Sequence, residues 1–259
     1  MEAPAASASD PCAACRHAAT LRAAAACNPA DVCVRATSGR RIDRFLRAHP
    51  ALAADYLADD FWERRAIAAR YAPLEAIRPL AADADEAVRR VVASRLPPVE
   101  AAALMRDSDR EVRITVAHRI DHERLLQMAG DPDYMVRIVV ARRLSHGKLP
   151  RLAQDPEREV RKTVARRLPA FALTRLLADP EPEVRRIVAA RALPHDALLL
   201  LADEDWLVRL GAVQRAPFHA IRACLTDPEP DVRRAAWERL AAGNGGKQST
   251  TENTDDPMG

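Results

Sequence analysis

Four of the five cysteines of this 259-residue chain lie close together near its amino terminus. They are Cys12, Cys15, Cys27 and Cys33, in the pattern C-x2-C-x11-C-x5-C. A segment this short has no hydrophobic core of its own, so a cross-link or a metal centre is expected to hold it. Four thiolates can bind one zinc ion or one iron–sulfur cluster, and the two-residue gap between Cys12 and Cys15 lets both sulfurs reach the same centre.

The spacing of the cysteines leaves three chemistries open. Structural zinc usually binds two C-x2–4-C pairs, whereas five residues separate Cys27 from Cys33. An iron–sulfur cluster tolerates irregular spacing and also uses four thiolates. Disulfides are least favoured, because a cytoplasmic location is expected and thiols stay reduced there. From spacing alone, zinc and an iron–sulfur centre are equally favoured.

Three further features accompany the cysteines. The alanine-rich stretch 17–26 predicts a helical spacer between the two cysteine pairs. His17 is a possible additional ligand, but four cysteines already complete a ligand set, so a solvated helix position is expected for it. The fifth cysteine, Cys224, occupies a position where other parts of the chain have leucine, and it is predicted to be a small core residue.

The elements that must position this segment are built from one repeated sequence. An aspartate returns every 24 residues, and an arginine follows each aspartate after six positions. The aspartates are Asp59, Asp83, Asp107, Asp131, Asp155, Asp179, Asp203 and Asp227, and the arginines are Arg65, Arg89, Arg113, Arg137, Arg161, Arg185, Arg209 and Arg233. A fixed period of this kind means that one supersecondary unit is copied and stacked as a solenoid.

Each repeat predicts one helix of about twelve residues followed by a short apolar segment. The repeat aspartate is expected to be the N-cap, with a proline such as Pro132 at the first helical position. Val88, Val92 and Leu96 are spaced for one helical face, which predicts the core side. In the short segment apolar residues lie three apart, which fits one α-turn or a stretch of 3₁₀ helix.

The segment DPDYMVRIVVARRL at 131–144, with its counterparts in the other repeats, resembles the leucine-rich repeat variant family. The period, the D-P start and the V-R pair all match, from residue 59 to about 242. HEAT-like repeats are the alternative, but their period is about 40 residues. The resemblance implies an all-α fold, a right-handed superhelical solenoid of alternating α and 3₁₀ helices without strands.

The same resemblance concerns the cysteine segment. Family members that resemble this chain from end to end have a small N-terminal domain with a [4Fe–4S] cluster ahead of the repeats, and the four cysteines match that domain one for one. The resemblance therefore implies a [4Fe–4S] cluster with Cys12, Cys15, Cys27 and Cys33 as ligands. The expected domains are a cluster domain at 1–40, about eight repeats and a partial first one at 41–242, and a disordered tail at 243–259.

Arginines border the predicted core face of each helix on both sides. The arginines of the 24-residue pattern lie on one border, where pairing with an acidic residue or a helix-end carbonyl of a neighbouring repeat is favoured over ligand binding. The other border carries Arg95, Arg119, Arg143, Arg167, Arg191, Arg215 and Arg239. An anion-binding strip is better supported by basic residues in less regular positions. These are Arg90, Arg142, Lys162, Arg166, Arg186 and Arg234.

Three aromatic residues share a position in repeats that are three apart. Trp62, Tyr134 and Trp206 each follow a repeat aspartate by three positions. Aromatic side chains spaced along a solenoid are candidate contacts for a partner. Chance, or packing against the first turn of a neighbouring repeat, is the favoured explanation.

Composition narrows the class of protein. With 48% apolar and only 4% aromatic residues, the core must be aliphatic, and a net charge of +3 is mild for a nucleic-acid-binding domain. The start of the chain lacks the features of a signal peptide, and no apolar run approaches the ~18 residues of a membrane helix. A cytoplasmic location without membrane association is therefore expected.

Common enzyme motifs are absent from the sequence. The sequence contains no P-loop, no G-x-S-x-G, no dinucleotide-binding glycines and no H-E-x-x-H, so neither an enzyme nor a small-molecule substrate is expected. The favoured hypothesis is an iron–sulfur protein whose solenoid binds a macromolecular partner, a protein rather than nucleic acid, with the cluster as redox or sensing element. The alternatives are a nucleic-acid-binding regulator that uses the basic edge and a structural cluster that caps the repeats.

Overall fold

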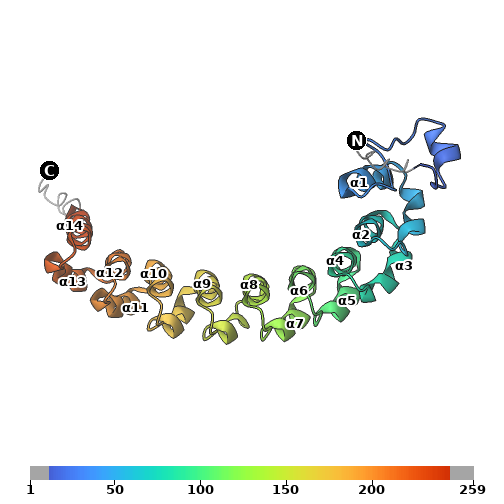
Figure 1. Ribbon diagram of the computed structural model, residues 1–259. Helices are drawn as coiled ribbons and strands as arrows, with labels where there is room; N and C mark the ends of the chain where they lie inside the picture. The colour runs from blue at the N-terminus through green and yellow to red at the C-terminus, as the bar shows by residue number, and fades with distance from the viewer. Residues whose placement is uncertain (1–11, 246–259) are drawn as a thin grey trace, which may run out of the picture. The chain divides into compact units, whose positions relative to one another are not determined.

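The computed structural model describes residues 12–245, and its elements are labelled in Figure 1. The chain divides after Met128 into two compact parts, Met1–Met128 and Ala129–Gly259, called here the N-terminal half and the C-terminal half. Of the expected tail at 243–259, residues 243–245 continue the last helix, and 246–259 lie outside the described residues.

The N-terminal half places two helices ahead of its repeats. A π-helical turn, η1 (Ala18–Arg22), precedes α1 (Gly39–Ala48) and the 3₁₀ helix η2 (Pro50–Tyr56). The repeats follow as α2 (Trp62–Tyr71), α3 (Leu74–Ile77) and η3 (Arg78–Ala82); α4 (Glu86–Arg95), α5 (Pro98–Ala101) and η4 (Ala102–Leu104); and α6 (Arg110–Ala117), α7 (His122–Leu125) and η5 (Leu126–Met128). The longer helices α2, α4 and α6 form one layer and the short segments form the other (Figure 1).

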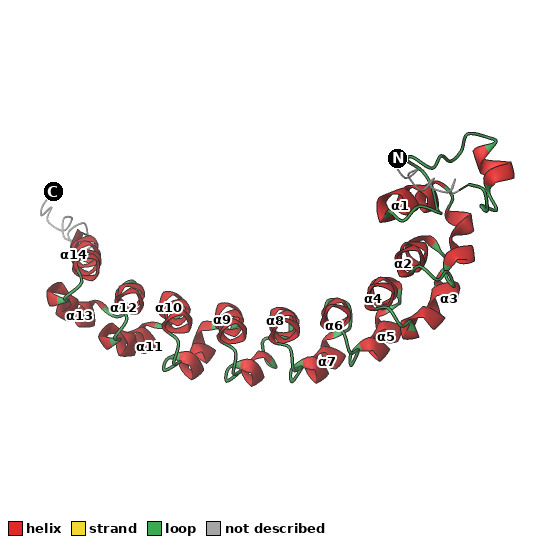
Figure 2. Cartoon of the chain, in the orientation of Figure 1, coloured by secondary structure: helices red, strands yellow, loops and turns green. Residues whose placement is uncertain are grey.

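The C-terminal half continues the same alternation and also has two layers. Its elements are α8 (Tyr134–Arg143) and η6 (Leu149–Leu152); α9 (Arg158–Arg167) and η7 (Ala170–Leu176); α10 (Pro182–Arg191), α11 (Pro194–Leu199) and η8 (Leu200–Ala202); α12 (Trp206–Val213), α13 (Phe218–Ile221) and η9 (Arg222–Thr226); and α14 (Pro230–Gly245). Within 12–245 the chain forms helices and loops without a named strand, which confirms the predicted fold class (Figure 2). No helix in this range is long and apolar enough to cross a membrane.

The aliphatic stripes fill the space between the two layers. Val160, Val164 and Leu168 of one repeat are fully buried, and so is Leu173 of its short segment. Cys224 is also buried, at 5% exposure, in the short-segment position that is leucine in several other repeats. The predicted core face and the core position of this cysteine are both confirmed.

The long helices begin later than predicted. In the repeat that starts at Asp131, the N-cap is Asp133, whose carboxylate accepts the amide of Met135 at 2.8 Å. Asp131 accepts a hydrogen bond from the amide of Asp133 at 2.9 Å, which closes a turn that contains Pro132. This turn precedes the helix. The prediction of the repeat aspartate as N-cap was therefore wrong, and the helix has ten residues rather than about twelve.

The short segments are mixed rather than uniform. In five repeats one α-turn leads directly into a 3₁₀ stretch, as at α11 and η8, whereas η6 and η7 are 3₁₀ helix throughout. The 3₁₀ stretches have three to seven residues. Because 3₁₀ hydrogen bonds have poorer geometry, such stretches rarely grow long.

The arginine of the V-R pair links its own repeat to the next one. Nε and Nη2 of Arg161 donate to the two carboxylate oxygens of Asp179 at 2.7 and 3.0 Å. Its Nη1 donates to the carbonyls of Asp155 and Pro156 at 2.9 and 3.1 Å. The same bidentate pairing recurs at Arg65–Asp83, Arg89–Asp107, Arg137–Asp155, Arg185–Asp203 and Arg209–Asp227. We call this set the Arg–Asp ladder, and it confirms the structural explanation of these arginines.

The second set of border arginines binds helix ends. Nη1 of Arg167 donates to the carbonyls of Ala141 and Leu144, at the end of the preceding long helix, at 2.8 and 2.7 Å. Equivalent bonds are made by Arg95, Arg119, Arg191 and Arg239. Carbonyls in the last turn of a helix have no partner within the helix, so a guanidinium is favourable there.

The ladder predicts loss of stability in acid. Hydrogen bonds from Arg209 lower the pKa of Asp227 below its ordinary value, and burial offsets them only partly. A carboxylate whose folded pKa is depressed stabilises the fold above its unfolded pKa of about 3.9, and the contribution is lost as pH falls through the folded pKa. We expect the urea midpoint to fall between pH 6 and pH 3, and Asp227→Asn to reduce this fall. An unchanged fall in Asp227→Asn, or an equal reduction in the exposed control Glu238→Gln, would contradict the prediction.

Candidate metal centre

None of the four N-terminal cysteines is joined to another by a disulfide. Cys12 and Cys33 are buried, and Cys15 and Cys27 are half-buried. Burial is the largest cause that raises the pKa of Cys27, and the charges of Cys15, Cys12 and Cys33 raise it further.

Local turns bring the first pair of cysteines together. The amide of Cys15 donates to the carbonyl of Cys12 at 3.1 Å, which closes a turn between them. The helix expected at 17–26 is present only as the π-helical turn Ala18–Arg22. The chain then turns at Ala25, whose positive φ of 56° lies in the left-handed region.

The second pair of cysteines is joined to the repeats. An isolated bridge pairs Asn28 with Val32, between Cys27 and Cys33. The amide of Cys33 donates to the carbonyl of Arg41 in α1 at 3.3 Å. Cys33 is thereby tied to the helix that leads into the first repeat.

His17 is buried, at 7% exposure, so the prediction of a solvated position was wrong. Its Nε2 lies 2.6 Å from the hydroxyl of Tyr56, and its ring packs on Phe45 with centroids 5.5 Å apart. Burial is the largest cause of the lowered pKa of His17. His17 therefore holds the cysteine segment against α1 and η2.

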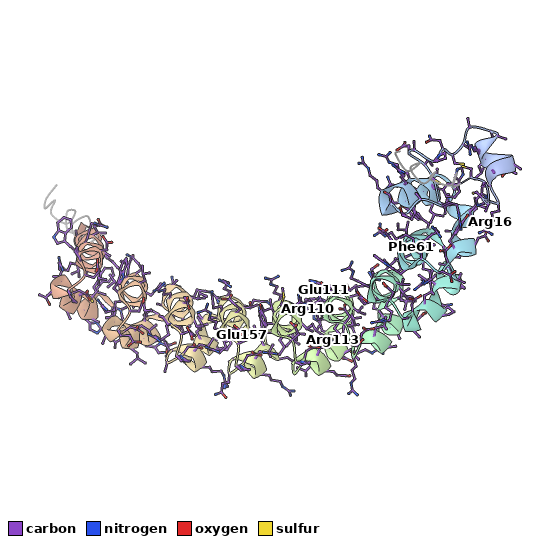
Figure 3. The ribbon with its side chains drawn as sticks, viewed as in Figure 1. Arg16, Phe61, Arg110, Glu111, Arg113 and Glu157 are labelled. Atoms are coloured by element: carbon purple, nitrogen blue, oxygen red, sulfur yellow. The ribbon has the colours of Figure 1, made fainter. Side chains whose placement is uncertain are left out.

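Arg16, which is labelled in Figure 3, contacts the same tyrosine as His17. Its guanidinium lies 4.7 Å from the centre of the Tyr56 ring, and it donates to the carbonyl of Asp55 at 3.3 Å. The sequence contains no repeat pattern across residues 16, 17 and 56, so this contact could not be predicted from it.

Arg64 of α2 fixes the loop that follows Cys33. It is buried, and its Nε donates to the carbonyl of Val34 at 2.6 Å, while Nη2 donates to that of Ala36 at 3.5 Å. It also pairs with Asp59. Our sequence reasoning missed Arg64, although a signal existed, because in this first repeat arginine replaces the valine of the V-R pair.

The donor set fits a centre held by thiolates. None of the four cysteines is in a disulfide, and contacts with η2, α1 and α2 anchor the segment that contains them. Within residues 12–245, no group of three or more His, Cys, Asp or Glu side chains is arranged to hold a single metal ion. A cluster needs four thiolates, and this segment can supply them.

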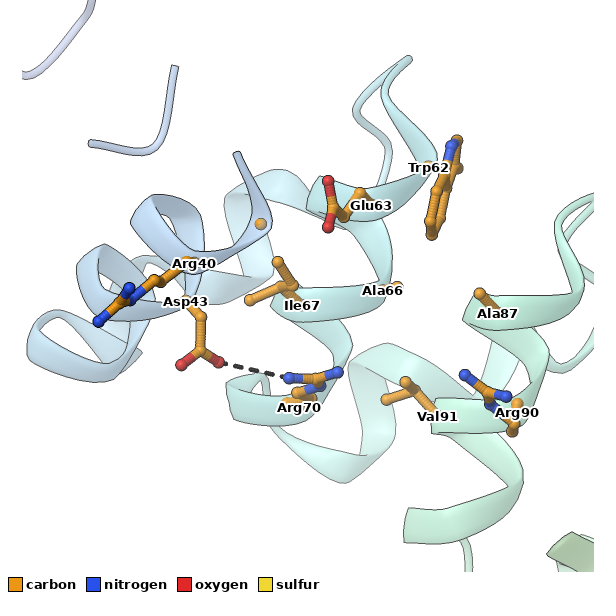
Figure 4. A pocket seen from close by; sticks show the side chains of 11 residues that line it. Arg40, Asp43, Trp62, Glu63, Ala66, Ile67, Arg70, Ala87, Arg90 and Val91 are labelled. Carbon is orange, nitrogen blue, oxygen red and sulfur yellow. Dashed lines mark hydrogen bonds and ion pairs between the residues drawn. The ribbon is translucent and has the colours of Figure 1, made fainter. Parts of the chain in front are cut away.

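The structure brings together two of the predicted partner residues. Trp62 and Arg90 line one groove of about 420 Å³ between α1, α2 and α4 (Figure 4). Trp62 begins α2 and is 43% exposed. Tyr134 and Trp206 begin α8 and α12 in the C-terminal half and are 41% and 36% exposed.

The other predicted basic residues differ in their surroundings. Arg186 is paired with Asp205 at 2.9 Å, and Arg234 with Asp231 at 2.6 Å, so both are engaged within the fold. Arg142 and Arg166 are exposed, without a hydrogen bond or ion pair to another described residue.

Comparisons with known proteins agree with this arrangement. A family model described as "LRV protein FeS4 cluster" matches residues 10–55, and one described as "Leucine rich repeat variant" matches 110–133 and 158–181. A solved structure titled "A leucine-rich repeat variant with a novel repetitive protein structural motif" is 54% identical, with a TM-score of 0.83; the match covers 88% of this chain and 97% of that one.

Other matches are weaker. Two engineered proteins of known structure are each 17% identical to this chain, with TM-scores of 0.40 and 0.21. The first match covers 81% of this chain and 86% of that one, and the second 76% and 97%. No curated protein matches the chain.

Proposed function

We propose that this chain, which belongs to the leucine-rich repeat variant family, holds a [4Fe–4S] cluster on Cys12, Cys15, Cys27 and Cys33 and uses it as a redox or sensing element. Its N-terminal segment is an iron–sulfur cluster domain. In this proposal the repeats are a scaffold that binds a protein partner, in the cytoplasm, and the protein is not an enzyme. When bound, such a cluster supplies one-electron exchange and sensitivity to oxidants.

The observation that carries the redox or sensing role is the partial exposure of the ligand set. Cys15 and Cys27 are half-buried, whereas Cys12 and Cys33 are buried. A centre with one side toward solvent can exchange electrons or lose iron without unfolding of the protein. Solvent exposure is also one of the factors that set the potential of a cluster.

A protein partner is favoured over nucleic acid because most regularly placed arginines are engaged. The arginines of the V-R pairs form the Arg–Asp ladder, and several arginines on the other border of the helices donate to helix-end carbonyls. A net charge of +3 leaves little excess for phosphate. Weak or no retention on heparin at low salt is expected, and salt-dependent retention would support a nucleic-acid-binding regulator instead.

A purely structural cap is the second candidate, and one observation favours it. Val34 belongs to the buried core of the N-terminal half, and Leu21, Cys27 and Val32 pack against that core. Terminal repeats need such a cover, because one of their faces has no neighbouring repeat.

Controlled reduction and removal of the cluster separates these roles. We expect anaerobic reduction and reoxidation to be reversible in the visible spectrum. We also expect the repeats to keep their far-UV circular dichroism after the cluster is removed by oxidation and chelation, because the Arg–Asp ladder holds them. Hydrogen exchange should increase only at residues 12–56. Cooperative loss of the whole helical signal, with no reversible redox step, would show that the cluster is a cap.

A further inference from the structure

We infer that the groove between α1, α2 and α4 is a docking site for an acidic protein segment that carries one apolar side chain. The inference rests on the proposed function, since it requires that the scaffold binds a protein, and it specifies where and by which chemistry. The groove measures about 420 Å³, and its residues come from all three helices (Figure 4).

The centre of the groove suits an apolar side chain. Ala66 and Ile67 of α2 are buried at 5% and 4% exposure, and Ala87 and Val91 of α4 are half-buried. Trp62 lies beside them with 43% of its surface exposed. A half-exposed tryptophan next to an apolar surface is the kind of residue that dominates binding energy in protein interfaces.

Two arginines that line the groove, one on α1 and one on α4, are available to a ligand. Arg40 of α1 and Arg90 of α4 are exposed, and neither makes a hydrogen bond or an ion pair with another described residue. Arg70 is different, because it lies 3.5 Å from Asp43, which also accepts a hydrogen bond from the hydroxyl of Tyr71 at 2.8 Å. The groove therefore offers two carboxylate-binding groups, one on each side of an apolar surface.

The acidic residues of the groove favour a peptide over nucleic acid. Asp43 and Glu63 line it together with the arginines. The carboxylate of Glu63 reaches across to Gly39 of α1, so closely that a Cβ at this position would meet it. A phosphate chain would be repelled by these carboxylates, and grooves for single-stranded nucleic acid are strongly positive along their length. A peptide can place its own carboxylates at Arg40 and Arg90 only.

The three tryptophans of the chain provide a reporter for this groove. In the holo-protein with Trp206→Phe and Trp237→Phe, Trp62 is the only tryptophan. We would titrate it at low salt with a synthetic peptide of Glu, Ser and one central Leu. We expect a saturable change in Trp62 fluorescence. Matched peptides with Gln for Glu, or Ala for Leu, are expected to bind on the order of tenfold more weakly.

Charge reversal then locates the binding site. Arg90→Glu in the reporter protein is expected to weaken binding of the acidic peptide on the order of tenfold. Arg166→Glu, at an equally unpaired and exposed position in the C-terminal half, is expected to leave it unchanged. Circular dichroism checks that both variants fold.

Three outcomes would overturn the inference: equal affinity for the Glu and Gln peptides, equal loss in the two arginine variants, or tighter binding of an oligo-dT strand than of any peptide. These failures are distinct from failure of the cluster proposal. The visible spectrum and its reversible change on reduction are recorded on the same samples, and they do not depend on the peptide.

Discussion

The variant Asp179→Ala is expected to lower the free energy of unfolding by about 3–5 kcal/mol. The side chains of Asp179 and Arg161 are 2% and 9% exposed, so the variant leaves a guanidinium buried without its anion. It also removes the acceptor of the Glu181 amide, which Asp179 binds at 3.0 Å. Urea unfolding at pH 7, followed by circular dichroism, measures the loss.

Two further variants show whether the buried charge is the cause. Arg158→Ala removes a neighbouring arginine whose contacts are exposed, including that with Glu181 at 3.7 Å, and it is expected to cost less than about 1 kcal/mol. Adding Arg161→Met to Asp179→Ala is expected to recover part of the stability, because the unpaired charge is then absent. A loss in Asp179→Ala as small as in Arg158→Ala would show that the ladder does not stabilise the stack.

Replacing Cys33 by serine is expected to abolish the cluster. The neutral hydroxyl of serine cannot take the place of a thiolate, so iron should fall from about four atoms per chain to near zero, with loss of the brown colour. Cys224→Ser is the matched control. Burial is the largest cause that raises the pKa of Cys224, so it stays a protonated core thiol, and iron should be unchanged. Anaerobic iron and sulfide analysis with visible spectra decides the result. A colourless wild-type protein with stoichiometric zinc would contradict the proposal.

The same variant is expected to affect the groove. The amide of Cys33 donates a hydrogen bond to the carbonyl of Arg41 in α1, and Arg64 donates one to the carbonyl of Val34. When Cys33 no longer has a centre to bind, α1 loses one of its fixed neighbours. Faster hydrogen exchange in 39–48, with no change in the C-terminal half, is the expected result.

The layers of the fold were predictable because one pattern is repeated many times. The apolar stripes predict the long helices, and the short segments follow from apolar residues three apart. The helix starts were not predictable to the residue. Asp83 and Asp85 can each cap the helix that follows, and only the structure shows that Arg65 binds Asp83 and that Asp85 is the cap. A tertiary contact thus decides between two caps that are locally equivalent.

The candidate site was predictable only as a set of residues. The cysteines could be read from their spacing, but the contacts that hold them depend on partners far apart in sequence. His17 finds Tyr56, and Arg64 finds Val34. Among the surface candidates, Arg186 is paired with Asp205. The sequence alone could not show whether Arg186 is paired or unpaired. The four ligands, the domain boundary at 40 and the protein partner stay predictions.

The Arg–Asp ladder has a direction, and this restricts how the gene for such a protein can change. Each bidentate pair joins an arginine to the aspartate eighteen positions later. Among the described residues, Arg233 of the last repeat binds only the carbonyls of its own repeat, and the sequence has threonine at position 251. Duplication or deletion of a whole 24-residue stretch keeps the spacing of every remaining pair, whereas a codon inserted between an arginine and its paired aspartate changes that spacing. Such arrays are therefore expected to change length only in whole copies. The aspartate of a repeat added after the last one would be in position to pair with Arg233.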